Sequence, residues 1–338
     1  MINMKAWADH LIESKERIAI PIMTHPGIEM IGQNVQNAVQ SGEVHAAAIK
    51  KLNEKYNVAA STVIMDLTLE AEAFGCKIEF QEDDMPHILG QLVSNAEEIE
   101  NLVVPDLTAG RIAQYLEANR LTINNFPDKP VLGGVIGPFS LAGRLYGMSE
   151  IMVACYIEPE SILALLEKCT SFILAYCKEL KTIGCSGVVI AEPAAGLLSN
   201  EDCEHFSSQF VKKIVDTLQD DFFMVILHNC GNNGQCTQAM LNTGANAYHF
   251  GNAIDMVETL KVCPKDKIVM GNIDPVGVMK MQTSTDVKTS VAELLDQTAS
   301  FKNFILSTGC DIPPNVPSEN LEAFFEALTD FNLIQSSN

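Results

Sequence analysis

Short apolar runs recur along the chain, and each one ends in glycine, proline or polar residues. The runs show no strict alternation with polar residues, which is typical of strands buried on both faces of a sheet. They lie at residues 18–23, 62–66, 131–136, 187–191, 223–227, 247–250, 268–271 and 304–307. We predict a parallel strand at each of these eight positions, within the usual boundary error of about two to four residues.

The segments between these runs carry apolar residues at helical spacing. The clearest are residues 43–56, 159–180 and 318–331, and Ser318 is placed to cap the last of them. Strands that alternate with helices predict an α/β fold, a (β/α)8 TIM-like barrel. We expect one barrel domain over residues 1–338, with residues 1–17 as an N-terminal helical extension.

The stretch between the second and third predicted strands, residues 67–130, exceeds a simple crossover. It contains KIEF at 77–80 ahead of an acidic loop, so we predict an insertion that adds a hairpin and helices. A doubly wound open sheet is the alternative architecture. Such sheets usually carry a glycine-rich phosphate loop, and the sequence has neither a G-x-G-x-x-G nor a Walker motif.

Charge and cysteine usage narrow the class of protein. The 338 residues include 22 basic and 43 acidic ones, a formal net charge of −21, which argues against nucleic-acid binding and against an anionic membrane surface. No apolar run reaches the length of about 20 residues that a membrane span needs. The charged N-terminus lacks the apolar core of a signal peptide, so we expect a cytoplasmic protein with reduced cysteines.

In a barrel of this kind, catalytic groups lie at the carboxyl ends of the strands. That rule selects the polar residues that follow the apolar runs: His25, Asp66, Glu192, His228, Cys230, His249, Asp274 and Cys310. Two thiolates and one imidazole, from His228, Cys230 and Cys310, form a typical zinc site. Three protein ligands leave a fourth position open, which is the catalytic arrangement.

Other assignments of the cysteines are open at this stage. His228 and Cys230 can be ordinary loop residues, because ten cysteines make chance pairing easy. Cys236 competes with Cys310 for the third ligand position, but it stands at the start of an expected helix that leads away from the barrel mouth. Cys169, Cys177 and Cys185 lie on or near the long amphipathic helix and are expected in the core.

The sequence around Glu192 and Asp66 is compatible with several roles for each carboxylate. Glu192 follows a strand directly, and it can be a fourth, displaceable zinc ligand, a catalytic base, or a cap of the next helix. Asp66 can be catalytic or can cap the helix that begins there. His25 and His249 are expected to be hydrogen-bonded histidines of the barrel rim.

Five segments give the sequence a resemblance to the uroporphyrinogen decarboxylase superfamily, and more narrowly to its zinc-dependent branch of methylcobamide:coenzyme M methyltransferases. They are MDLTLEAEAFG (65–75), IGPFSLAGRLYG (136–147), AEPAAGLLS (191–199), LHNCG (227–231) and STGCDIPPNVPSENL (307–321). His228-x-Cys230 with the distal Cys310 matches the metal pattern of that branch. Asp66 matches the position of the catalytic aspartate in the decarboxylase. The decarboxylase itself has an arginine-rich loop after its first strand, whereas PIMTHPGIEMIG (21–32) contains no arginine.

The resemblance implies an enzyme of one-carbon metabolism, a methyltransferase that contains zinc. It would move a methyl group from a methylcobamide, held by a corrinoid protein, to a thiol such as coenzyme M, with zinc activating the thiolate. The acidic surface suits docking of that partner. Methyl transfer in the opposite direction, a non-thiol acceptor such as tetrahydrofolate, and a decarboxylase-like tetrapyrrole enzyme or binding protein are the alternatives.

Overall fold

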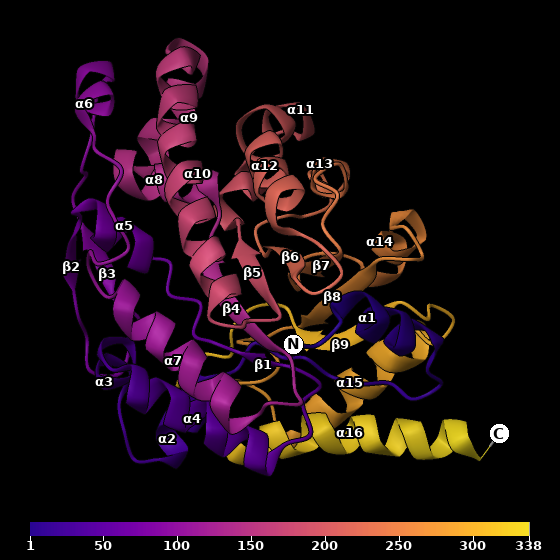
Figure 1. Ribbon diagram of the computed structural model, residues 1–338. Helices are drawn as coiled ribbons and strands as arrows, with labels where there is room; N and C mark the ends of the chain where they lie inside the picture. The colour runs from indigo at the N-terminus through magenta and orange to yellow at the C-terminus, as the bar shows by residue number, and fades with distance from the viewer. Residues whose placement is uncertain (338) are drawn as a thin grey trace.

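The computed structural model, which describes residues 1–337, contains a parallel sheet whose strands follow one another in chain order. Among these residues the sheet has seven strands in the order β1-β4-β5-β6-β7-β8-β9. They are β1 Ser61–Thr62, β4 Val131–Ile136, β5 Gly187–Ala191, β6 Met224–Asn229, β7 Ala247–Phe250, β8 Ile268–Ile273 and β9 Phe304–Thr308. In Figure 1 the helices surround these strands.

Residues 18–23 close the sheet into a barrel. The amide of Ile20 donates to the carbonyl of Leu306 in β9, and the amide of Leu306 donates to Ile18. On the other side, the amide of Ala59 donates to Ala19 just before β1 begins. The barrel prediction is therefore confirmed, and the open doubly wound sheet is wrong.

Two of the predicted strands are shorter than expected, for identifiable reasons. Segment 18–23 forms only an isolated bridge at Ala19, because Pro21 has no amide hydrogen to donate to a neighbouring strand. The run 62–66 leaves the sheet after Thr62. There the amide of Ile64 donates to His45 and that of Met65 to Asp311, so side chains replace the strand partners.

The helices at 43–56, 159–180 and 318–331 are confirmed. The helical elements outside the 67–130 insertion are α1 Met4–Glu13, α2 His25–Met30, α3 Val35–Gln40, α4 Gly42–Lys55, α8 Pro138–Tyr146, α9 Met148–Ile157, α10 Pro159–Thr182, η1 Pro193–Leu197, α11 Asn200–Cys203, η2 Glu204–Ser208, α12 Gln209–Leu218, α13 Thr237–Leu241, α14 Met256–Val262, α15 Ser284–Gln297 and α16 Ser318–Ser336. The predicted cap at Ser318 is wrong. Pro317 occupies the cap position, its carbonyl accepts from Asn320 and Leu321, and no side chain caps the helix.

The insertion after the second barrel strand contains the expected hairpin. Strands β2 Lys77–Glu79 and β3 His87–Leu89 pair antiparallel, with Ile78 opposite Ile88. The remaining elements of the insertion are the helices α5 Leu69–Phe74, α6 Ala96–Asn101 and α7 Ile112–Asn125. Figure 1 shows the hairpin and α6 at one side of the barrel.

The interior of the barrel is filled from one end by apolar side chains. Alternate strand positions such as Leu132, Val189, Ile226 and Ile305 form one buried cluster, and Met4 of α1 belongs to it. Trp7 and Leu11 of the same helix pack on this cluster, so α1 lies over the amino-terminal end of the barrel. The polar candidate residues lie at the opposite end of the barrel, where the strands have their carboxyl ends. None of the helices within residues 1–337 is long and apolar enough to span a membrane.

Candidate metal centre

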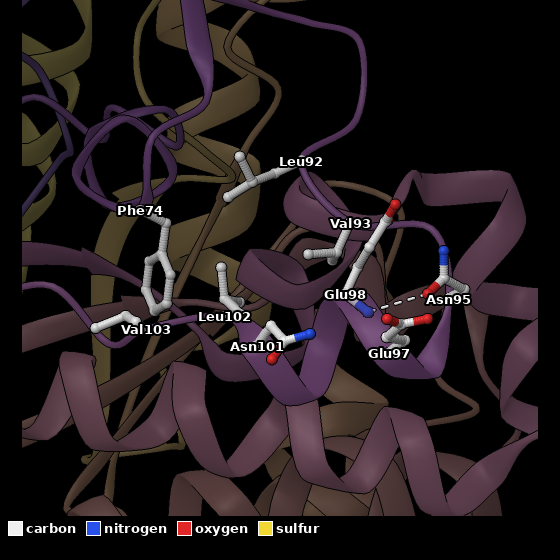
Figure 2. Close-up of a pocket in the computed structure, with 9 residues that line it drawn as sticks. All are labelled: Phe74, Leu92, Val93, Asn95, Glu97, Glu98, Asn101, Leu102 and Val103. Atoms are coloured by element: carbon white, nitrogen blue, oxygen red, sulfur yellow. Dashed lines mark hydrogen bonds between the residues drawn. The ribbon is translucent and has the colours of Figure 1, made fainter.

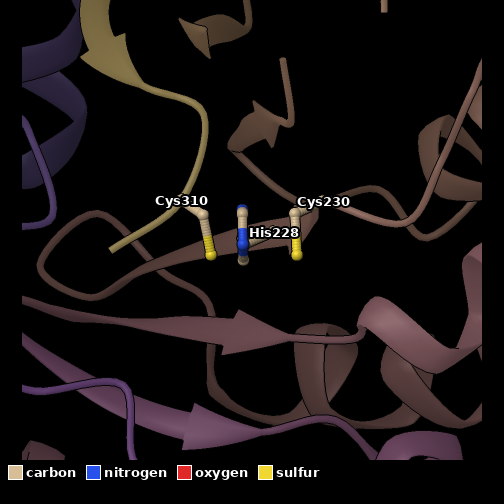
Figure 3. Close-up of side chains that lie close together, drawn as sticks. All are labelled: His228, Cys230 and Cys310. Atoms are coloured by element: carbon tan, nitrogen blue, oxygen red, sulfur yellow. The ribbon is translucent and has the colours of Figure 1, made fainter. Parts of the chain in front are cut away.

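Three residues that are distant in sequence meet at the carboxyl ends of the strands. His228 lies in β6, Cys230 follows that strand directly, and Cys310 follows β9. One ligand atom from each residue lies within 4.8 Å of the others. A tetrahedral zinc ion with bonds of about 2.3 Å to sulfur places two thiolates about 3.8 Å apart, so a small contraction would complete the geometry. Figure 3 shows the imidazole between the two thiols.

The period of the strands explains why His228 faces inward. Side chains two residues apart lie on the same face of a strand. Ile226 belongs to the barrel interior, so His228 occupies the next inward layer toward the mouth. The same step takes Ala247 to His249 in β7 and Ile305 to Ser307 in β9.

Glycines allow the ligand loops to approach each other. A Cβ atom on Gly251, after β7, would lie 2.7 Å from the Cα atom of Cys230. A Cβ atom on Gly309 would lie 2.6 Å from the amide nitrogen of Asn252. The loop after β7 therefore fits between the loops that carry Cys230 and Cys310 only because neither glycine has a side chain. The close approaches at Gly251 and Gly309 were not predicted, because in a sequence a glycine after a strand indicates only a turn.

The three ligand candidates differ in exposure. His228 is 2% exposed, whereas Cys230 and Cys310 are only partly buried. The contact between the two thiols lowers the pKa of Cys230 and raises that of Cys310 to about 12. Cys230 and Cys310 are thus the more accessible residues of the three, and His228 is the buried one.

His249 lies directly behind His228. The Nδ1 atoms of the two rings are 2.7 Å apart, and Nε2 of His249 is 2.8 Å from the hydroxyl of Ser307. Burial, and then the neighbouring His228, lower the pKa of His249 well below its usual range. The prediction of a hydrogen-bonded rim histidine is confirmed, but its contact with a ligand candidate was not anticipated.

Glu192 lies outside the group of three ligand candidates. Its side chain is buried, and it accepts hydrogen bonds from the amides of Phe139 and Ser140 and from the hydroxyl of Ser207, at 2.8 to 2.9 Å. Burial raises its pKa, although these donors oppose the shift. The carboxylate caps the first turn of α8, a helix earlier in the chain, instead of the next one. Its role as fourth ligand or base stays a prediction, and ligation would require these donors to be given up.

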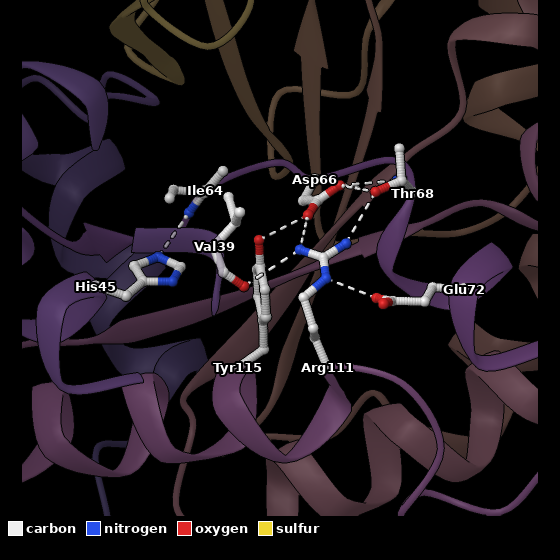
Figure 4. Close-up of polar contacts among 8 residues, drawn as sticks. All are labelled: Val39, His45, Ile64, Asp66, Thr68, Glu72, Arg111 and Tyr115. Atoms are coloured by element: carbon white, nitrogen blue, oxygen red, sulfur yellow. Dashed lines mark hydrogen bonds and ion pairs between the residues drawn. The ribbon is translucent and has the colours of Figure 1, made fainter. Parts of the chain in front are cut away.

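Asp66 belongs to a second polar cluster at the same end of the barrel (Figure 4). One carboxylate oxygen accepts from Arg111 at 2.6 Å and from Tyr115 at 2.9 Å, and the other accepts from the amide and hydroxyl of Thr68. Arg111 also contacts Glu72 at 2.6 Å. The helix-capping interpretation of Asp66 is wrong, because Thr68 is the cap residue of α5. A catalytic role for Asp66 stays a prediction.

The other polar candidates are not brought to the metal centre. His25 is buried at the start of α2, with Nε2 3.8 Å from the carboxylate of Asp311 and Nδ1 without a hydrogen-bond partner among residues 1–337, so the prediction of a hydrogen-bonded histidine is wrong here because no donor or acceptor lies close enough. Asp274 accepts from the amides of Val276 and Gly277 in a turn after β8. Cys236 donates to backbone carbonyls at 3.2 to 3.3 Å, so the preference for Cys310 agrees with the geometry. Cys169, Cys177 and Cys185 are buried in the core as predicted.

A surface pocket of about 560 Å³ is formed by residues of the 67–130 insertion, and it holds none of the candidate residues. Phe74, Leu92 and Val93 line it together with Glu97 and Glu98 (Figure 2). Its wall combines buried and partly buried apolar side chains with two carboxylates, and it contains no thiol or imidazole of the kind found at the barrel mouth. Within residues 1–337, the one group of three potential metal-ligating side chains lies instead at the ends of β6 and β9.

The chain is similar to known proteins in both sequence and structure. A family profile described as uroporphyrinogen decarboxylase (URO-D) matches residues 17–331. A methylcobamide:CoM methyltransferase MtbA from Methanosarcina mazei is 32% identical over 300 residues, 86% of each chain. A methylated-thiol–coenzyme M methyltransferase from the same organism is 25% identical and covers 81% of this chain and 73% of its own. A solved methyltransferase structure from Methanosarcina mazei superposes with a TM-score of 0.87 at 21% identity, covering 98% and 99% of the two chains.

Proposed function

We propose that this chain, which belongs to the uroporphyrinogen decarboxylase family, transfers a methyl group from a protein-bound methylcobamide to a thiol such as coenzyme M. Within the family it groups with the methylcobamide:CoM methyltransferases, so it is a methyltransferase enzyme. The observation that carries the finer proposal is the cluster of His228, Cys230 and Cys310, in which both cysteines are only partly buried.

The donor set fits zinc. Two thiolates and an imidazole are the ligands that zinc prefers, and no fourth side chain joins the group within the described residues. Zinc held there would lower the pKa of an acceptor thiol, so that its thiolate predominates at neutral pH. His228 and the two cysteines would hold the ion at the barrel mouth. The acceptor sulfur then forms its bond to the methyl carbon as the cobalt–carbon bond breaks, and the bonding electron pair stays on cobalt.

Arg144 supports an acceptor with a negative end. It is the one residue of α8 that is not buried, and among residues 1–337 its side chain has no hydrogen bond or ion pair. Burial lowers the pKa of Arg144, and Asp66 partly opposes this shift. A partly desolvated guanidinium without a partner is unfavourable, whereas a sulfonate such as that of coenzyme M would satisfy it.

The decarboxylase alternative is less well supported by the same features. A tetrapyrrole with many carboxylates needs several free cations, and residues 21–32 contain no arginine. Arg111, which is near the mouth, is already bound by Asp66 and Glu72. A single uncommitted arginine suits one small anionic group better.

We also propose that the methyl donor is carried by a separate corrinoid protein that docks over the barrel mouth. The net charge of −21 favours a partner with a complementary basic surface. A cytoplasmic location is supported by the ten cysteines, all of which are unpaired in the structure.

The proposed reaction is tested by incubating the protein with methylcobalamin and separate acceptors: coenzyme M, homocysteine and tetrahydrofolate. The absorption spectrum of the cobalamin reports demethylation. We expect turnover with a thiol, fastest with coenzyme M, and none with Cys310→Ala. Turnover with tetrahydrofolate alone would reject the thiol acceptor. Methylation of reduced cobalamin by methylated coenzyme M, without the forward reaction, would reverse the proposed direction.

A further inference from the structure

A continuous row of polar contacts leads from the metal centre into the wall of the barrel. It runs from His228 in β6 to His249 in β7, then to Ser307 in β9, and ends at the carbonyl of Ile20. The three side chains are each at most 2% exposed. Three different strands and the closing segment of the barrel thus meet behind one ligand candidate.

The last acceptor in the row fixes where the hydrogens lie. A carbonyl can only accept, so the Ser307 hydroxyl donates its hydrogen to Ile20 over 2.8 Å. The Ser307 oxygen is then the acceptor for Nε2 of His249, 2.8 Å away. His249 therefore carries a hydrogen on Nε2, and in its neutral form it presents an unprotonated Nδ1 to His228.

Two nitrogens 2.7 Å apart require one hydrogen between them, and two assignments exist for it. If His249 held it, that ring would be a buried cation, and the side chains that it contacts within residues 1–337, those of His228 and Ser307, are not anionic. If His228 holds it, both rings are neutral and every donor has an acceptor. The second assignment leaves Nε2 of His228 without a hydrogen.

We propose that His249 and Ser307 are positioning residues that hold His228 as the Nδ1–H tautomer, with the lone pair of Nε2 directed to the metal centre. This inference rests on the proposed function, because the ligand role of His228 does. The row of contacts replaces the carboxylate that often orients a metal-bound histidine, and it does so without adding charge behind the site. The metal would thus be bound by two thiolates and a ring whose tautomer is set before the metal arrives.

The tautomer is tested first in the metal-free protein, so that the result does not depend on metal binding or activity. Histidine is labelled with a nitrogen isotope, and the His228 signals are assigned by their loss in His228→Gln. We expect a protonated Nδ1 and an unprotonated Nε2 in the wild type. In His249→Leu the pattern should change toward a mixture of tautomers. An Nε2–H tautomer in the wild type, or an unchanged pattern in His249→Leu, would overturn the proposal.

Metal affinity gives the second readout, measured by competition with a chromophoric chelator. His249→Leu should bind zinc about 10- to 100-fold more weakly, the usual effect of losing the partner of a ligating histidine. His249→Gln should restore most of the affinity, because its carbonyl can accept from His228 and its amide can donate to Ser307. Ser307→Ala should give a smaller loss, since it frees His249 to reverse its tautomer.

Tyr248→Phe is the matched control. Tyr248 precedes His249 in β7, its side chain lies on the opposite face, and its hydroxyl donates to the carbonyl of Leu241. It loses one hydrogen bond and should keep wild-type zinc affinity. Equal losses in Tyr248→Phe and His249→Leu, or no rescue by His249→Gln, would show a merely structural role. If the wild type bound no zinc but showed the expected tautomer, the proposed function and the ligand role of His228 would fail, whereas the assignment of its tautomer to His249 and Ser307 would stand.

Discussion

Two polar clusters lie at the same end of the barrel, and they differ in how completely their atoms are used. Around Asp66, each carboxylate oxygen has two donors, and Arg111 has acceptors in four residues (Figure 4). Cys230 and Cys310 are only partly buried and lie on either side of His228 (Figure 3), and the ring of His228 also contacts His249.

The difference shows which cluster has ligand atoms available to a molecule or ion from outside the chain. Buried polar groups are stable only when their hydrogen-bonding capacity is satisfied. The Asp66 cluster meets that condition within the chain, and it ties the insertion, through Arg111 and Tyr115, to the end of β1. In the cysteine cluster the ligand atoms contact mainly one another, which leaves them available to a metal ion. Ligand atoms that remain available at a barrel mouth are therefore better evidence for a metal site than charged residues that are already paired within the chain.

The largest expected effect is the loss of metal from the cysteine cluster. Cys310→Ala removes one of three ligands, so zinc affinity should fall by more than the roughly 100-fold typical of changes around the ligands. Metal content after gel filtration measures this. Cys236→Ala is the control, because Cys236 is a buried thiol outside the cluster, and it should keep about one zinc per chain. Full zinc in Cys310→Ala would remove Cys310 from the site.

The Asp66 cluster should respond in the opposite way, with a loss of stability and no loss of metal. Arg111→Met leaves Asp66 and Glu72 without their cation, and breaking such a buried pair costs about 3–5 kcal/mol in free energy of unfolding. Arg120→Met on the same helix removes an exposed pair with Glu117 and should cost less than about 1 kcal/mol. Urea unfolding with parallel zinc analysis checks both. Zinc loss in a folded Arg111→Met protein would contradict this prediction and would show that metal binding depends on the Asp66 cluster.

A substitution of Arg144 tests whether this arginine recognises the anionic end of the acceptor. Arg144→Gln should raise KM for coenzyme M about tenfold or more, because a charge-assisted hydrogen bond is lost. The KM for 2-mercaptoethanol, a neutral thiol, should not change, and that comparison is the internal control. A similar increase for both thiols would point to a general disturbance of α8.

A further expected effect appears only when the pH is changed, and it concerns the stability of the region near the Asp66 cluster. Burial raises the pKa of Glu70 to about 8, while Asp66, Arg111 and Tyr176 lie close enough to influence or feel its charge. The folded state therefore holds this proton more tightly than the unfolded state. Its contribution is fully present below the unfolded pKa and is lost as pH rises toward 8.

Glu70→Gln should flatten this loss. Its amide oxygen can still accept from the backbone of Ile136, as Glu70 does now. The decline in free energy of unfolding between pH 5 and 8, at most about 1.4 kcal/mol for each pH unit from one proton, should become smaller. Urea unfolding at several pH values measures the slope. An unchanged slope would show that Glu70 is ionised in the folded protein.

The barrel and most strand positions followed from the sequence, because buried parallel strands are short apolar runs that local pattern reveals. The ligand group His228, Cys230 and Cys310 was also predicted, since strand ends converge at one barrel face. What escaped prediction depended on tertiary contacts. The capping of α8 by Glu192 and the binding of Asp66 by Arg111 join residues 53 and 45 positions apart. No local pattern records such pairs.

The contact between His228 and His249 could have been predicted from the sequence. Both histidines stand two residues beyond an inward-facing apolar residue on adjacent strands, and the strand period places them side by side in register. The close packing at Gly251 and Gly309 could not be predicted in this way, because it depends on the separation of two loops. The division into one domain with an N-terminal extension stays a prediction.

The central claim is that the cysteine cluster holds zinc with one position open to a thiol. X-ray absorption spectroscopy at the zinc edge, before and after coenzyme M is added to the purified protein, tests it most directly. We predict two sulfur ligands and one histidine with one light atom at rest, and a third sulfur in place of the light atom when the thiol is present. A ligand shell that does not change on thiol addition, or one with four protein ligands, would contradict the account.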